Sequence, residues 1–263
     1  MEVMVYVDPS PRGEWALALA RQVSESWASR LHLVATAEDV AASPALLERA
    51  RAAVAAAGVT EAVRPGPAER AVVAEALSRE WGLVIVPPAG RGAIARMLRG
   101  SRVATVVRAV RAPVLVARRP PPRVDRVLGA LSGRRSTEAV VDAALEWELR
   151  TGARASFVHV SAEVPVGAPA DGGAPDRDLD RELDRILAVL HRRSATDRLA
   201  IRDGLVVDEV LDAFEQQAQH LLVVGARDEG DAGFGREDVT ERLLLACPGS
   251  TLVVPSGSRA ARG

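Results

Sequence analysis

The chain has 263 residues, of which 48% are hydrophobic and 26% charged, and its formal net charge is −1. This composition is typical of a globular protein with one large domain or two of ordinary size, and the near-neutral charge gives no footprint for nucleic acid or an acidic membrane surface. All 34 basic residues are arginine. This excludes three sites that need a lysine: the Walker A site, the protein-kinase site and the pyridoxal phosphate Schiff base.

The sequence also bears on the compartment. Acidic and polar residues interrupt the N-terminus from Glu2 onward, so we expect no signal peptide. No apolar run approaches the roughly 20 residues of a membrane span. Cys247 is the single cysteine, which excludes an intrachain disulfide and a cysteine-rich zinc site. We therefore expect a cytoplasmic protein that binds neither membrane nor nucleic acid.

The first part of the chain alternates between short apolar runs and longer alanine-rich stretches. The apolar runs have the pattern of buried strands and comprise residues 3–7, 31–36, 62–64, 83–86 and 114–117. Between them, residues 14–29 and 68–80 have the length and amphipathic pattern of helices. This alternation predicts β-α-β units and a parallel sheet with helices on both faces.

A second series of the same pattern begins after the stretch Arg-Arg-Pro-Pro-Pro-Arg at 118–123. Three consecutive prolines cannot continue a sheet, so we interpret this stretch as a linker. Residues 3–7 correspond to 127–131 with a shift of 124, and residues 83–86 correspond to 221–224 with a shift of 138. Residues 114–117 then correspond to 251–254 with a shift of 137. The chain is therefore predicted to contain two copies of one five-stranded domain.

The growth of the shift from 124 to 138 indicates a 14-residue insertion in the second copy, at 164–177. Its Pro, Gly, Ala and Asp residues predict a mobile surface segment. We expect a first domain over 1–119, a Pro-rich linker over 120–124, a second domain over 125–257 and a tail over 258–263. The last strand of each copy would otherwise expose an apolar edge, so we expect 114–117 and 251–254 to pair with each other.

The stretch GRGAIARMLRGS at 90–101 follows the fourth predicted strand of the first copy. In an open parallel sheet, ligands bind beyond the carboxyl ends of the strands. Gly90 and Gly100 allow close approach of a ligand, and Ser101 is a good N-cap for a helix over 103–110. The free amides of such a helix form an anion site. From these residues alone, a flexible loop that leads into a capped helix remains the alternative.

The ordered motifs resemble those of the universal stress protein family, in its tandem two-domain form. Family domains open with a strand that ends in Asp, here VMVYVDPS with Asp8, and close with a strand of the type found here as APVLVARR. The family's nucleotide loop has the form G-x2-G-x9-G-[ST]. In this chain Pro87, Gly90, Gly100 and Ser101 match its positions, with proline in place of the first glycine.

This resemblance implies two tandem α/β domains with Rossmann-like, adenine nucleotide alpha hydrolase-like five-stranded parallel sheets, and a role in stress response. It further implies one ATP in the first copy, with adenine near Asp8 and the phosphates on Gly90, Gly100 and Ser101. By position, Thr36 and Val86 would line the base and ribose, and Arg102 would reach the phosphates. Pro87 removes a backbone N–H at the rim of the site.

The second copy departs from the family pattern at the same places. Its first strand ends in Ser132 where the family has Asp, and Glu237-Asp238 replace Gly-Ser in its loop, which reads GARDEGDAGFGRED from Gly225. Five acidic residues in this loop outnumber two arginines and disfavour a polyphosphate. We therefore expect the second copy to keep the fold without the ligand.

Other candidate sites have structural interpretations. The stretch 132–137 (SGRRST) is similar to the SGGxDS loop of ATP pyrophosphatase-like enzymes, but it lacks the second glycine and the aspartate, so we expect an ordinary capped turn. Residues 176–193 predict an exposed helix with i,i+4 ion pairs. Cys247 is expected to be buried and inert. We expect packing roles for the histidines within strands and for the tryptophans: His32, His159, Trp15, Trp27, Trp81 and Trp147.

Three functions remain open from the sequence. The first is an ATP-binding stress protein with catalysis absent or slow, because no general base and no acidic cluster for Mg²⁺ accompany the first loop. The second is an interaction scaffold that binds no nucleotide. The third is a slow ATPase or phosphotransferase in which Asp8 acts on phosphate. The sequence leaves open whether Mg²⁺ accompanies the nucleotide and whether the intrachain pair of domains also forms a homodimer.

Overall fold

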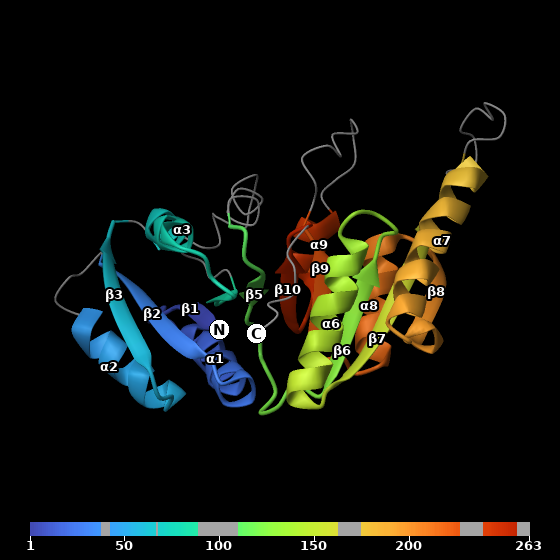
Figure 1. Ribbon diagram of the computed structural model, residues 1–263. Helices are drawn as coiled ribbons and strands as arrows, with labels where there is room; N and C mark the ends of the chain where they lie inside the picture. Colours follow the sequence, from blue (N-terminus) through green and yellow to red (C-terminus); the bar gives the residue numbers. More distant parts are fainter. Residues whose placement is uncertain (38–42, 67, 89–109, 163–174, 227–238, 257–263) are drawn as a thin grey trace.

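The computed structural model describes residues 1–37, 43–66, 68–88, 110–162, 175–226 and 239–256. Strands and helices alternate through the first half as predicted (Figure 1). The elements of this half are β1 (Glu2–Tyr6), α1 (Gly13–Trp27), β2 (Arg30–Ala37), α2 (Ser43–Val54), β3 (Val59–Pro65), α3 (Ala68–Ser78), β4 (Leu83–Val86) and β5 (Val114–Val116).

The second half repeats this order. Its elements are β6 (Arg126–Leu131), α6 (Thr137–Thr151), β7 (Arg154–Ala162), α7 (Pro175–Arg192), a 3₁₀ turn (Thr196–Arg198), β8 (Leu199–Gly204), α8 (Val206–Gln216), β9 (Leu221–Gly225), α9 (Val239–Ala246) and β10 (Ser250–Val254). Helices α1 and α6 differ by the predicted shift of 124 at both ends.

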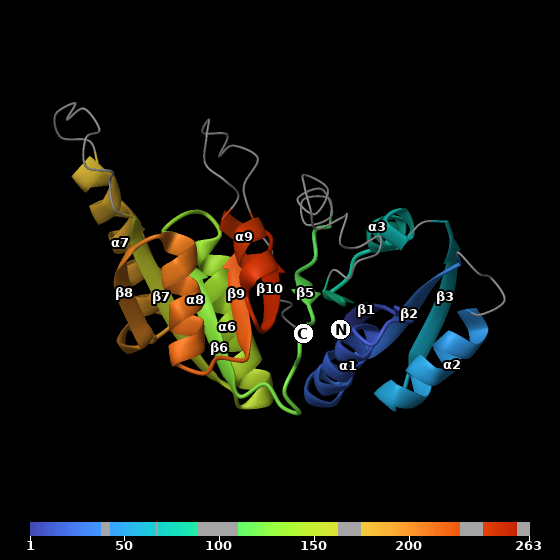
Figure 2. The same ribbon diagram turned by 180° about the vertical axis from the view of Figure 1, so that it is seen from behind.

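All ten strands form one sheet in the order β3-β2-β1-β4-β5-β10-β9-β6-β7-β8 (Figures 1 and 2). Within each half the strands are parallel. The two halves meet where β5 and β10 pair antiparallel, with Leu115 opposite Leu252. The predicted five-stranded units and the predicted pairing of the last strands are confirmed.

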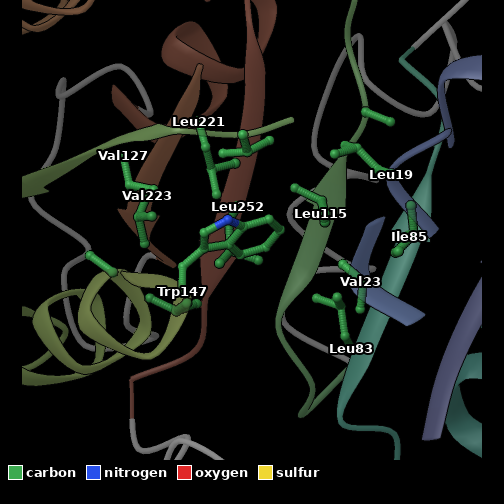
Figure 3. Close-up of a cluster of buried hydrophobic side chains, with 14 of the residues drawn as sticks. Leu19, Val23, Leu83, Ile85, Leu115, Val127, Trp147, Leu221, Val223 and Leu252 are labelled. Carbon is green, nitrogen blue, oxygen red and sulfur yellow. The ribbon is translucent and has the colours of Figure 1, made fainter. Parts of the chain in front are cut away.

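Two apolar cores lie on the two faces of this sheet, and both extend across the junction between the halves. Helices α1, α2, α6 and α7 supply the core on one face, whereas α3, α8 and α9 supply the other. On the first face Val23 and Trp147 belong to one buried cluster with Leu115 and Leu252 (Figure 3). Because the buried surface is continuous across the junction, the two halves stabilise each other.

Polar and aromatic contacts also join the halves. The rings of Trp27 and Trp147 meet edge to face with centroids 5.3 Å apart. The guanidinium of Arg118, which follows β5, donates to the carbonyls of Leu244 and Leu245 at 3.0 Å and to that of Cys247. These carbonyls belong to the last turn of α9, where orphan acceptors and the helix dipole favour a cation.

The histidines within strands make contacts inside the fold. His159 is buried, and its Nδ1 lies 2.9 Å from the carbonyl O of Leu131, so its packing role is confirmed. His32 on β2 places Nδ1 2.8 Å from Thr60 Oγ1 and Nε2 3.1 Å from Glu75 Oε1. Burial lowers the pKa of His32, and the nearby Glu75 only partly opposes this effect.

Two local predictions are wrong. Ser136 precedes α6 but has helical backbone angles and makes no side-chain capping hydrogen bond, so 132–137 is not the expected capped turn. The mobile insertion was predicted to reach residue 177, but Pro175–Arg177 already form the first turn of α7. The helix predicted at 176–193 is present as α7, which ends at Arg192, but it is only partly exposed, because Ile186, Val189 and Leu190 pack in the core.

Candidate functional site

The candidate site of the first half lies where β1 and β4 end side by side. Strand β1 has β2 on one side and β4 on the other, so the connections that follow β1 and β4 run to opposite sides of this point in the sheet. In open parallel sheets, ligands bind at such a position, beyond the carboxyl ends of the strands. Tyr6 pairs with Val34, which brings Asp8 level with Thr36 two residues further along each chain. Val5 pairs with Ile85, so Val86 and Pro87 reach the same edge.

The structure therefore places four of the eight predicted site residues on one sheet edge. These are Asp8, Thr36, Val86 and Pro87. The other four lie outside the described residues: Gly90, Gly100, Ser101 and Arg102.

Asp8 is held in a fixed turn at the end of β1. Its Oδ1 accepts a hydrogen bond of 2.7 Å from the backbone N–H of Ser10, the geometry of an Asx turn. Among the described residues this is the one hydrogen bond to the carboxylate, and the side chain is half exposed. Oδ2 is therefore available to accept from a ligand N–H or hydroxyl group.

Gly13, the first residue of α1, is required by this turn. A Cβ atom built on Gly13 would lie 2.0 Å from the carbonyl O of Asp8, so only glycine allows the helix to start so close to the turn. The sequence analysis did not identify this residue. Its signal was a glycine directly before a helical pattern and five residues after the strand-ending aspartate.

Beside Asp8, the corner is built from buried groups. The hydroxyl of Tyr6, a residue only 3% exposed, lies 3.4 Å from Thr36 Oγ1, so Tyr6 is a second contributor that the sequence analysis missed. Val86 and Pro87 are buried, and the carbonyl of Val86 accepts from Ala117 N at 2.8 Å. The site therefore has a hydroxyl pair and an apolar wall next to one carboxylate.

The corresponding edge of the second half is filled by the protein itself. Gly133, which follows Ser132, is buried because α7 packs on it: a Cβ there would lie 2.6 Å from Cβ of Glu182. Arg185 also donates to the carbonyl of Gly133 at 2.5 Å. A Cβ on Gly225, at the end of β9, would lie 2.2 Å from Ser136 Oγ.

The loops that follow β1 and β6 consequently differ in exposure. Residues 9–12 of the first half are all exposed, whereas Gly133 and Ser136 at the matching positions are buried. The two halves share a fold, but among the described residues the turn after the first strand is more exposed in the first half than in the second, where Ser132 and Arg135 are exposed and Gly133 and Ser136 are buried.

The model of the Universal stress protein family matches this chain twice, over residues 2–118 and 123–255. The chain belongs to the universal stress protein family. It is thus a tandem member with two universal stress domains joined at the β5–β10 pair. A search of curated proteins finds no match.

Solved structures with a similar fold match nearly the whole chain. A functionally unknown protein from Pseudomonas aeruginosa PAO1 is 17% identical, with a TM-score of 0.73 over 97% of this chain and 92% of that one. A universal stress protein from Archaeoglobus fulgidus is 16% identical, with a TM-score of 0.66 over 97% and 98%. The cytoplasmic domain of a prokaryotic cation chloride cotransporter is 12% identical, with a TM-score of 0.51 over 99% and 97%. At these identities the likeness concerns the fold alone.

The described parts of the universal stress domains contain neither a metal cluster nor a membrane-spanning helix. There, no group of three His, Cys, Asp or Glu side chains is placed to hold a metal ion. No helix within the same residues is long and apolar enough to cross a membrane.

Proposed function

We propose that this tandem universal stress protein binds one adenine nucleotide, ATP, in its first half and acts in stress response through that bound state. The observation that carries the proposal is the contrast between the two sheet edges. Around Asp8 the loop is exposed and one carboxylate oxygen is available, whereas in the matching loop of the second half Gly133 packs against Glu182 and Ser136 is buried against Gly225.

The described corner suits the nucleoside part of such a ligand. Asp8 can accept from the adenine amino group or a ribose hydroxyl, and Thr36 with Tyr6 offers a second polar contact. Val86 supplies an apolar wall for the base. The phosphates would then extend to Gly90, Gly100, Ser101 and Arg102, where helix amides and a guanidinium would bind them.

Binding without rapid turnover agrees with the groups present. Asp8 is the acidic residue at the described corner, and its carboxylate is turned toward the Ser10 amide by the Asx turn. Hydrolysis needs a base that activates water and groups that hold Mg²⁺ on the phosphates. Any Mg²⁺ would then be held mainly by the phosphates and water, so we propose a binding protein with at most slow ATPase activity.

Calorimetry with adenosine, AMP, ADP and ATP tests the proposal. We expect one site per chain and tighter binding with each added phosphate, because a charge-assisted contact contributes about 1.5–3 kcal/mol. Asp8→Ala should weaken adenosine and ATP by similar factors, since it removes a contact to the nucleoside. Ser132→Ala, an exposed residue at the matching position of the second half, should change neither.

Two results would contradict this assignment. Affinity that does not depend on phosphate number would show that the arginine-rich loop does not bind phosphate. Binding that is lost in Ser132→Ala but kept in Asp8→Ala would place the nucleotide in the second half.

The scaffold function is the second candidate, and Pro87 favours it. Proline has no N–H to offer where the family loop has glycine. Under this alternative, no adenine nucleotide binds at millimolar concentration and none co-purifies with the protein. Mass spectrometry of the small molecules released from the purified chain separates the two functions. Turnover that is lost in Asp8→Asn while ATP still binds would instead support the slow ATPase or phosphotransferase.

A further inference from the structure

A groove of about 390 Å³ lies at the amino ends of the strands of the second half, away from the edge that contains Ser132. It forms where the chain segment after β5, the end of α8 and the turn before β10 meet. Pro121, Phe214 and Pro248 supply its apolar lining. This volume is within the range of small-molecule sites in proteins.

Two opposite charges line this groove and do not pair with each other. Arg119 and Glu215 are both exposed, and neither has an ion-pair partner among the described residues. The backbone on each side of Arg119 is fixed, because Arg118 N–H donates to Ser250 Oγ at 3.0 Å and the Pro121 carbonyl accepts from Gln22. Arg119 itself has a φ of 43°, an uncommon conformation for a residue other than glycine. The groove thus has a cation at a fixed backbone position and an anion in the same lining.

The wall of the groove adds one donor and one buried polar residue. His220 Nδ1 accepts the backbone N–H of Asp125 at 3.1 Å, so the neutral ring carries its proton on Nε2 and can donate it. Gln219 is 91% buried, and its Nε2 donates to Ser156 Oγ and to Gln217 Oε1. Its Oε1 accepts no hydrogen bond from any described residue. This oxygen is itself closed off from the groove, so Gln219 contributes a buried, fixed part of the wall and no acceptor for a ligand.

We propose that this groove binds a free α-amino acid with an apolar side chain. The carboxylate would lie between Arg119 and the Nε2–H of His220, and the ammonium group would face Glu215 and the wall that contains Gln219. The side chain would pack on Phe214, Pro121 and Pro248. A zwitterion matches both charges at once, whereas a peptide end carries only one of the two groups. The proposal is independent of nucleotide binding in the other half.

Calorimetry of the full chain with L-phenylalanine and L-leucine tests it. We expect at least one of the two to bind, and both its methyl ester and its N-acetyl derivative to bind much more weakly. Arg119→Gln and Glu215→Gln should each weaken binding by roughly 10- to 100-fold, the effect of losing one charge-assisted contact. The matched controls Arg70→Gln and Glu80→Gln change exposed charges outside the groove and should leave affinity unchanged.

Three outcomes would overturn the proposal. The first is that neither amino acid binds. The second is that a methyl ester or N-acetyl derivative binds as tightly as the free amino acid, which would indicate a peptide end. The third is that neither Arg119→Gln nor Glu215→Gln changes the affinity. ATP titrations of Arg119→Gln distinguish this failure from that of the nucleotide proposal, since they should match those of the wild type.

Discussion

Replacing Trp147 with phenylalanine should cost little stability, although the residue is only 1% exposed and lies at the junction of the halves. Its indole Nε1 is buried and has no hydrogen-bond partner among the described residues. Trp81 offers a matched comparison, because it is also buried but its Nε1 donates to the carbonyl of Glu75 at 3.2 Å. The guanidinium of Arg79 lies 4.0 Å from the Trp81 ring centroid.

The two substitutions differ in what happens to the N–H group. Each loses part of one ring, about 1–2 kcal/mol of burial and cavity free energy. Trp147→Phe also removes an unpaired buried donor whose desolvation costs about 1–3 kcal/mol, so the net change should be within about 1 kcal/mol of zero. Trp81→Phe loses a formed hydrogen bond of about 1 kcal/mol and weakens a cation–π contact. We expect it to cost about 2–3 kcal/mol.

Urea unfolding followed by far-UV circular dichroism measures both changes. Because the apolar cores cross the junction, we expect one transition for the whole chain, with equal slopes for the two variants. Trp147→Ala should lower stability by about 3–5 kcal/mol in the same transition. If Trp147→Phe costs as much as Trp81→Phe, the Trp147 N–H is satisfied and the reasoning is wrong.

Two further predictions concern titratable groups. Burial lowers the pKa of His32 below its unfolded value of about 6.5; Glu75 opposes this effect, and the nearby Arg79 and Arg64 add to it. The neutral His32 therefore contributes to stability above pH 6.5, and this contribution is lost as the pH falls toward the lowered pKa. The urea midpoint should drop more between pH 7 and 5 in the wild type than in His32→Gln, and equal drops would contradict this. Burial raises the pKa of the Cys247 thiol, so a chromogenic disulfide reagent at pH 8 should label it only after unfolding; rapid labelling of the native chain would show that the thiol is accessible.

Much of the fold followed from repetition in the sequence. The shifts between the copies predicted five matching strands in each half, and the shift of 124 holds at both ends of α1 and α6. The strand predicted at 62–64 is longer, Val59–Pro65, since most side chains of this edge strand are exposed and leave no apolar run.

The candidate site was predictable only in part. Asp8, Thr36, Val86 and Pro87 share an edge because parallel strands end together. The packing of α7 on Gly133 was not predictable, because it joins segments about fifty residues apart through tertiary contact. Short-range patterns do not encode such contacts.

The junction is not symmetric, and this bears on how chains recognise each other. By the shift of 124, Trp147 on α6 occupies the place that Val23 occupies on α1, and both belong to the buried cluster at the junction (Figure 3). Two copies of the second half joined in the same way would force two indoles into the space of an indole and an isopropyl group. Two copies of the first half would leave that space partly empty. Close packing penalises both errors, so each half is complementary to the other and not to itself. The junction thereby disfavours pairing between like halves of neighbouring molecules.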